Sequence, residues 1–220
     1  MDEIKNTQSK FSPQSFSSNP ERRCPVVIIT DTSGSMSGQP IQELNAGLVS
    51  LKKEWCSHEL AVKRIEACIV SFPPVRIEVN FQPVLQFTAP CFSACGETPL
   101  GAAILKALET IYDRVLLYKA NGQGYYQPLI FLITDGQPKD NWQEAARRIH
   151  DGEAAKHFAF FAVGVHGADM DILKQISVRE PLELDRTNFQ EFFQWVSVKS
   201  IAASTPGSKL SLPGPGWTKK

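Results

Sequence analysis

Short runs of consecutive apolar residues recur along the chain and predict strands that are buried on both faces of a sheet. They occupy residues 25–30 (PVVIIT), 129–134 (LIFLIT) and 158–165 (FAFFAVGV). Two further strand-like runs, residues 64–72 and 75–81, are separated only by Pro73 and Pro74. Because two residues are too few for a crossover helix, we expect this pair to form an antiparallel hairpin.

Segments with apolar residues three and four positions apart lie between these strands and predict amphipathic helices. Residues 40–55 show the spacing most clearly, and Pro40 suits the first turn of a helix there. We expect the other helices at about residues 99–118, 140–156, 169–176 and 188–203, with a short strand near 182–184. Asp140 with Gln143 would cap the helix at 140–156, and Asp169 would start the next one.

This alternation of helices with fully apolar strands predicts an α/β fold with a mainly parallel sheet, helices on both faces and an antiparallel edge strand. The expected organisation is an extended lead-in at residues 1–23, one domain at 24–204 and a Pro/Gly-rich tail at 205–220. Ligands of such open sheets bind at the carboxyl ends of the strands. The loops after Thr30, before Pro99 and after Thr134 are therefore the places to search for a site.

Charge and composition exclude several classes of function. The chain has 23 Lys and Arg against 23 Asp and Glu, which argues against duplex DNA or an anionic membrane as a partner. No uncharged apolar run reaches the roughly 18 residues of a membrane span, and the first residues lack the pattern of a secretory signal. The five cysteines are odd in number and scattered, so we expect free thiols and a cytoplasmic location.

Oxygen-bearing side chains gather in the three loops singled out above. Asp31, Ser33 and Ser35 follow the first buried strand, Asp135 follows the strand at 129–134, and Thr98 stands where a loop turns into a helix. A carboxylate at the tip of a buried strand is costly unless something pairs with it, and the first loop contains neither Lys nor Arg. Alternate residues of an extended loop can point the same way, so these side chains can converge.

Carboxylates and hydroxyls are hard oxygen donors, which suit Mg²⁺, with Mn²⁺ or Ca²⁺ as substitutes, rather than zinc. Two carboxylates balance a divalent ion, while three hydroxyls add no charge. If the carboxylates act partly through water, the ion stays electrophilic and can accept an Asp or Glu of a partner protein. The pattern then predicts a metal-centred adhesion site rather than a closed structural one.

The motif Asp31-x-Ser33-x-Ser35, with Thr98 and Asp135, resembles the metal-ion-dependent adhesion site of von Willebrand factor type A (vWA) domains, and the order of elements is similar. The segments ELNAGL, FLITDG, ISVREPL and STPG resemble bacterial proteins of the tellurite-resistance TerY type. The resemblance implies a six-stranded sheet with five parallel strands. It also implies direct metal contacts from the three hydroxyls, carboxylates largely in the second shell, and a stress-resistance gene cluster that encodes a kinase and a phosphatase.

Other interpretations of these residues stay open at this level. Asp31, Ser33 and Ser35 could form a polar turn that caps the next helix, Thr98 could cap the helix after Pro99, and Asp135 could belong to an Asp-Gly turn. Cys91 and Cys95 miss the CxxC spacing of zinc and redox sites. The four histidines are isolated and are expected near the surface.

Two other functions compete with a metal-dependent interaction module. One is a metal-dependent phosphohydrolase that uses the same site, although no phosphate-binding glycine loop, GxSxG elbow or general base is visible. The other is an adaptor for an AAA+ ATPase, a role that other domains of the resembled family play.

Overall fold

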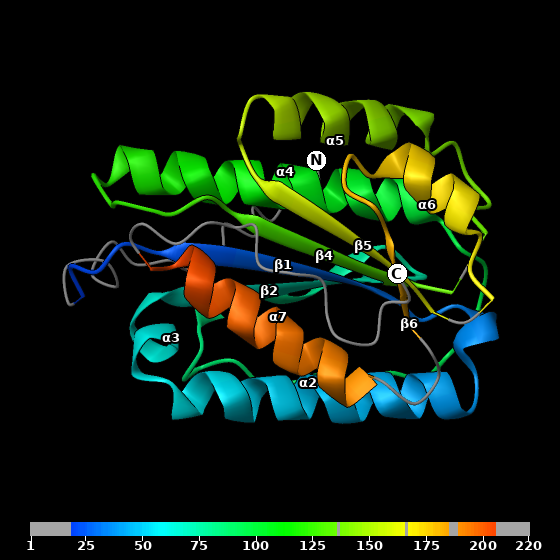
Figure 1. Ribbon diagram of the computed structural model, residues 1–220, viewed down its shortest axis with the longest axis horizontal. Helices are drawn as coiled ribbons and strands as arrows, with labels where there is room; N and C mark the ends of the chain where they lie inside the picture. The colour runs from blue at the N-terminus through cyan, green and yellow to red at the C-terminus, as the bar shows by residue number, and fades with distance from the viewer. Residues whose placement is uncertain (1–18, 136, 166, 185–188, 206–220) are drawn as a thin grey trace, which may run out of the picture.

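The computed structural model describes residues 19–135, 137–165, 167–184 and 189–205. They form a six-stranded sheet with helices on both faces (Figure 1). The strands are β1 (Cys24–Asp31), β2 (Ile65–Phe72), β3 (Arg76–Pro83), β4 (Leu129–Thr134), β5 (Ala159–Val165) and β6 (Leu182–Leu184). The helices are the 3-10 turn η1 (Gly34–Met36), α2 (Gln39–Ser57), α3 (Glu59–Arg64), α4 (Leu100–Ala120), α5 (Gln143–Ala154), α6 (Met170–Ile176) and α7 (Phe189–Ala203). Most of the expected lead-in and tail, residues 1–18 and 206–220, lies outside the described residues.

The strand order is β3-β2-β1-β4-β5-β6, and all neighbours are parallel except β2 and β3. The predicted α/β fold and the antiparallel edge hairpin are therefore confirmed. β1 pairs with β2 on one side and with β4 on the other, so the strand order reverses around β1. The carboxyl ends of β1 and β4 consequently lie side by side, at the position where open sheets of this type bind ligands.

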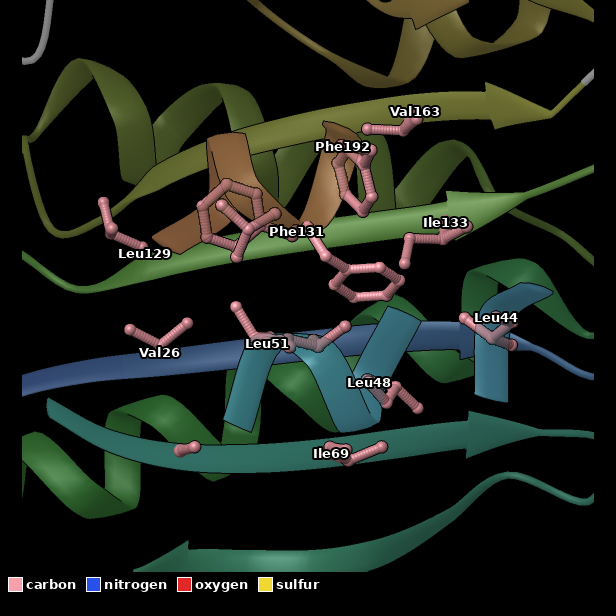
Figure 2. Packing of buried hydrophobic residues seen from close by; sticks show 14 of the residues in the cluster. Val26, Leu44, Leu48, Leu51, Ile69, Leu129, Phe131, Ile133, Val163 and Phe192 are labelled. Carbon is pink, nitrogen blue, oxygen red and sulfur yellow. The ribbon is translucent and has the colours of Figure 1, made fainter. Parts of the chain in front are cut away.

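Successive residues of each buried strand point to opposite faces of the sheet and fill two separate cores. Val26 and Ile28 of β1 pack on the face covered by α2 and α7, whereas Val27 and Ile29 pack on the face covered by α4 and α5. Figure 2 shows the first core, where Phe131 at the centre of β4 lies beneath Phe192 of α7. Apolar runs without alternation were therefore correctly interpreted as strands covered on both faces.

The helices follow the sequence expectations with a few differences at their ends. α2 has Pro40 in its first turn as predicted, and Asp169 caps α6 by accepting a hydrogen bond from the amide of Ile172 at 3.1 Å. α5 ends at Ala154 because Lys156, two residues later, adopts a left-handed backbone with φ of 56°. α3 was not predicted, since six residues are too few to show a helical period. No helix of the described residues is long and apolar enough to cross a membrane.

Candidate metal centre

Four of the five predicted site residues form a chain of hydrogen bonds at the carboxyl ends of β1 and β4. Asp31 Oδ1 accepts a hydrogen bond from the amide of Ser33 at 2.8 Å. The hydroxyls of Ser33 and Ser35 lie 3.0 Å apart, and the Ser35 hydroxyl donates to Asp135 Oδ1 at 2.7 Å. Side chains that are up to about a hundred positions apart in the sequence therefore meet at one point, as predicted.

Thr98, the fifth predicted residue, is held beside this chain by backbone hydrogen bonds. Its loop is tied to the first loop, because Cys95 N donates to Thr32 O at 2.8 Å and Gly34 N donates to Gly96 O at 3.0 Å. The Thr98 carbonyl accepts from Lys139 N at 2.9 Å, which ties the same residue to the loop after β4. Thr98 is thus buried at the junction of all three loops.

The Asp31–Ser35 loop does form a local polar turn, because Asp31 accepts from the Ser33 amide and Ser33 is the N-cap residue of η1, although the Ser33 side chain makes no capping hydrogen bond. The N-cap of α2 is Gly38, so the Asp31–Ser35 loop does not cap that helix. The N-cap of α4 is Pro99 rather than Thr98, and the first-turn amides of α4 donate to Asp140, so the Thr98 hydroxyl does not serve as the cap of that helix. Gly136, which would complete the Asp-Gly turn after β4, lies outside the described residues.

Burial makes the site electrostatically costly for its own carboxylates. Asp31 is fully buried, and loss of water raises its pKa to about 6 despite hydrogen bonds from Thr134 and Ser33. The nearby Asp135 charge adds to this rise, and burial also raises the pKa of Asp135 itself. Across the described parts of the chain, neither carboxylate forms an ion pair with Lys or Arg. A cation at this point would offset the charge of both.

The donor set fits a hard divalent cation. It offers two carboxylates and three hydroxyls, and a hydroxyl oxygen can donate its proton to a carboxylate while a lone pair faces a metal. The described residues contain no cluster of three or more His, Cys, Asp and Glu side chains that could hold a metal. The donor set proposed here is of another kind, because it combines two carboxylates, Asp31 and Asp135, with three hydroxyl groups.

Sequence reasoning missed two residues that support the site. The Thr134 hydroxyl donates to Asp31 Oδ2 at 2.6 Å, so β4 orients the carboxylate of β1. The repeated Thr-Asp at the ends of β1 and β4 was the available signal. Asp140 was expected to cap α5, which was wrong: its two carboxylate oxygens accept from Gly101 N at 3.0 Å and Ala102 N at 2.8 Å in the first turn of α4. A long-range partner of this kind leaves no local signature.

Replacing Asp140 with alanine is expected to lower the free energy of unfolding by about 1–2 kcal/mol, because two amides at the start of α4 lose a charged acceptor. Urea unfolding followed by circular dichroism would measure the change. Asp151→Ala is the matched control, since Asp151 is exposed and its carboxylate pairs, among the described residues, only with Arg147 at 3.4 Å, and it should shift stability by less than about 0.5 kcal/mol. Equal effects of the two variants would contradict the capping role.

The cysteines and histidines are not part of the donor set. The cysteines are free thiols as predicted: Cys56, Cys91 and Cys95 are exposed, and Cys24 and Cys68 are buried. Burial raises the pKa of both buried thiols to about 12, so they stay protonated. Three histidines are exposed as expected, at positions 58, 150 and 157, and the fourth lies outside the described residues.

Comparison with known families and structures agrees with this fold. Residues 91–198, which include Thr98 and Asp135, match the von Willebrand factor type A domain model. The vWF domain of the type V pili tip protein Mfa5 from Porphyromonas gingivalis superposes with a TM-score of 0.60 at 10% identity, over 81% of this chain and 96% of that chain. This chain has the fold of a vWA domain. No curated protein sequence matches it.

Two further solved structures share the vWA fold. Proximal thread matrix protein 1 from the mussel byssus has a TM-score of 0.57 at 16% identity over 81% of this chain, which spans about half (48%) of the mussel protein's length. The manganese-loaded TRAP protein of Plasmodium vivax has a TM-score of 0.51 at 16% identity over 77% of this chain and 71% of that one. At such low identities these structures show the fold of the vWA domain and no more.

Proposed function

We propose that this vWA domain is a protein-interaction module whose binding depends on a divalent metal. The observation that carries the proposal is the convergence of Asp31, Ser33, Ser35 and Asp135 in one hydrogen-bonded chain around a buried carboxylate. Among the residues that the structure describes, neither carboxylate pairs with a cationic side chain, so a bound cation would stabilise both. Thr98, held at the same junction, supplies a further hydroxyl.

In this proposal the three hydroxyls contact Mg²⁺ directly and the two carboxylates act largely through water. An ion held mainly by neutral oxygens keeps a strong attraction for an outside carboxylate. A partner's Asp or Glu would therefore complete the coordination sphere and bind only while the metal is present. The TRAP neighbour is described as manganese-loaded, and Mn²⁺ should replace Mg²⁺ at a site with this oxygen set.

The setting is proposed from the sequence resemblance alone. We propose that the domain spans residues 24–204, acts in the cytoplasm in a TerY-type stress or tellurite-resistance system, and binds a kinase or phosphatase of the same gene cluster. We also propose that it is not an enzyme, since the titratable groups of the site, Asp31 and Asp135, are already engaged in hydrogen bonds within the donor cluster.

Mg²⁺ and Mn²⁺ are each expected to stabilise the protein against thermal unfolding. At a hundredfold excess over the dissociation constant, binding to the folded state adds about 2.7 kcal/mol. Asp31→Ala and Thr98→Ala should remove this gain. Ser37→Ala is the matched control, because Ser37 is an exposed serine of the same loop outside the donor set. Calorimetric titration of EDTA-treated protein with each metal would give the affinities directly.

Two results would contradict the assigned ligands. One is loss of the metal-dependent thermal stabilisation in Ser37→Ala, and the other is its persistence in Asp31→Ala. The second step is capture of partner proteins with Mg²⁺, with EDTA and with the Asp31→Ala variant. Capture that persists in EDTA would overturn the metal-dependent mechanism. A captured partner should lose binding when one of its own Asp or Glu residues is changed to Asn or Gln.

A phosphohydrolase and an AAA+ adaptor remain the alternative functions of the same site. Turnover of generic phosphoesters by purified protein, abolished in Asp31→Ala, would favour the enzyme. Metal-dependent recovery of an AAA+ ATPase as the captured partner would favour the adaptor.

A further inference from the structure

A large apolar groove lies at the edge of the sheet opposite the metal centre. It has a volume of about 880 Å³ and is bounded by the second half of α4, residues 125–128 before β4, the end of α5 and the turn before β5. These segments adjoin the amino ends of β4 and β5, whereas the metal centre lies at the carboxyl ends of β1 and β4. In Figure 1 the strands run from left to right between these two edges.

The groove has an apolar floor and exposed apolar walls. Ile111 and Phe158 are buried at its base, while Tyr112 and Leu116 of α4 are 63% and 44% exposed. The Phe158 ring packs directly against Gly152 of α5. A side chain at that position would clash with the ring, because its Cβ would lie 2.4 Å from the ring atoms. Large exposed apolar side chains beside a rigid hollow are typical of a binding surface.

The charges that line the groove are predominantly positive. Its two acidic residues are already paired, Glu109 with Lys106 at 2.8 Å and Asp151 with Arg147 at 3.4 Å. Lys119 and Lys156 also line it, and neither forms an ion pair within the described ranges. The groove therefore presents an apolar surface with two lysines whose charges are not neutralised.

Lys156 occupies a position where lysine is unfavourable for the backbone. It follows the end of α5 with φ of 56°, a conformation usually left to Gly or Asn. Lys156 is the sole non-glycine residue with positive φ in the described parts of the chain. This backbone conformation ends α5 and fixes the place of Lys156 beside the groove.

We propose that this groove binds an acidic amphipathic helix of a partner protein, with the helix's apolar residues between α4 and α5 and its Asp or Glu residues beside Lys119 and Lys156. Apolar anchors at helical spacing in a groove, flanked by complementary charge, are a common mode of peptide recognition. The exposed side chains of Tyr112 and Leu116 leave the groove accessible from solvent along α4, which suits a helix better than a small ligand that must be largely enclosed. Its concave shape suits a helix better than a flat bilayer.

The groove does not depend on the metal centre. Together with the proposed function, however, it would give this vWA domain two binding sites at opposite edges of one rigid sheet, so that one partner could be held at each.

Selection from a phage-displayed library of random peptides about four helical turns long would test the proposal. Peptides that bind the wild-type protein should be enriched in apolar residues at i, i+3, i+4 and i+7 and in Asp and Glu between them. Binding of a selected peptide should weaken at least about tenfold in Tyr112→Asp/Leu116→Asp and in Lys119→Glu/Lys156→Glu. Val49→Asp/Val198→Asp is the matched control, since both valines are exposed on helices of the other face.

Binding of the selected peptide should be the same in Mg²⁺, in EDTA and in Asp31→Ala, which separates this site from the metal centre. No enrichment, enrichment of Lys and Arg, or equal loss in the control variant would overturn the proposal. A different result would assign the groove to lipid instead. In that case peptide selection fails, the wild-type protein binds oleate or vesicles of phosphatidylserine and phosphatidylcholine, and the groove variants abolish this binding.

Discussion

Replacing Glu66 with alanine is expected to lower the free energy of unfolding by about 3–5 kcal/mol. Glu66 is 3% exposed in β2, and its Oε2 accepts hydrogen bonds from Arg114 Nε at 2.9 Å, from Arg114 Nη2 and from the Tyr118 hydroxyl. Its Oε1 lies 3.4 Å from Nε of Arg23, which is also buried. The alanine variant would leave two buried guanidinium groups without this carboxylate.

The buried tyrosine of this network remains a hydrogen-bond donor. Burial and the Glu66 charge hold the pKa of Tyr118 well above its usual value, so its hydroxyl stays protonated. Chemical denaturation of Glu66→Ala would measure the loss. The double variant Glu66→Leu/Arg114→Met should recover much of it, because apolar replacement of a buried pair is often neutral or stabilising. A single-variant loss below about 1 kcal/mol would show that water replaces the carboxylate.

Replacing Phe131 with alanine is expected to cost a similar 3–5 kcal/mol, through the cavity left in the core between the sheet and α7. Phe131 is fully buried in β4. Its ring stacks on Phe161 of β5 at a centroid distance of 5.2 Å and meets the ring of Trp195 of α7 edge-on at a centroid distance of 5.9 Å. The three rings lie on two strands and a helix, so the site cannot collapse without moving one of these elements.

Leu85→Ala is the control for this variant, because Leu85 is 64% exposed and its truncation should change stability by less than about 0.5 kcal/mol. Differential scanning calorimetry would compare the two. If Phe131→Ala lowered the free energy of unfolding no more than Leu85→Ala does, the prediction would be wrong. Helix α7 would then have to move onto the sheet and fill the cavity.

The strands were predictable because their signal is local. Residues 129–133 are apolar at every position and Thr134 follows them, which is typical of a short strand covered on both faces, and β4 spans Leu129–Thr134. Two prolines between residues 64–72 and 75–81 left no room for a crossover, and the hairpin of β2 and β3 followed. Short α3 and the Glu66 network carried no such signal, since an isolated glutamate in a strand does not reveal its partners.

The oxygen donors of the site were also readable in advance. The spacing of Asp31, Ser33 and Ser35 indicated a common target, and the repeated Thr-Asp after two buried strands indicated that Asp135 would join them. The role of Asp140 was mistaken because a local rule placed it at the nearest helix, α5. In the structure, the Asp140 carboxylate instead accepts hydrogen bonds from the amides of Gly101 and Ala102 in α4, about 40 positions away in the chain.

The sequence by itself determined which segments become strands and helices, and which side chains can serve as oxygen donors, because hydrophobic period and donor chemistry are properties of neighbouring residues. Only the tertiary structure decided which distant residues meet. The order β3-β2-β1-β4-β5-β6 brings Asp31 beside Asp135, buries Glu66 against Arg23 and Arg114, and opens an apolar groove between α4 and α5. Each of these depends on the packing of elements far apart in the chain, which no local pattern encodes.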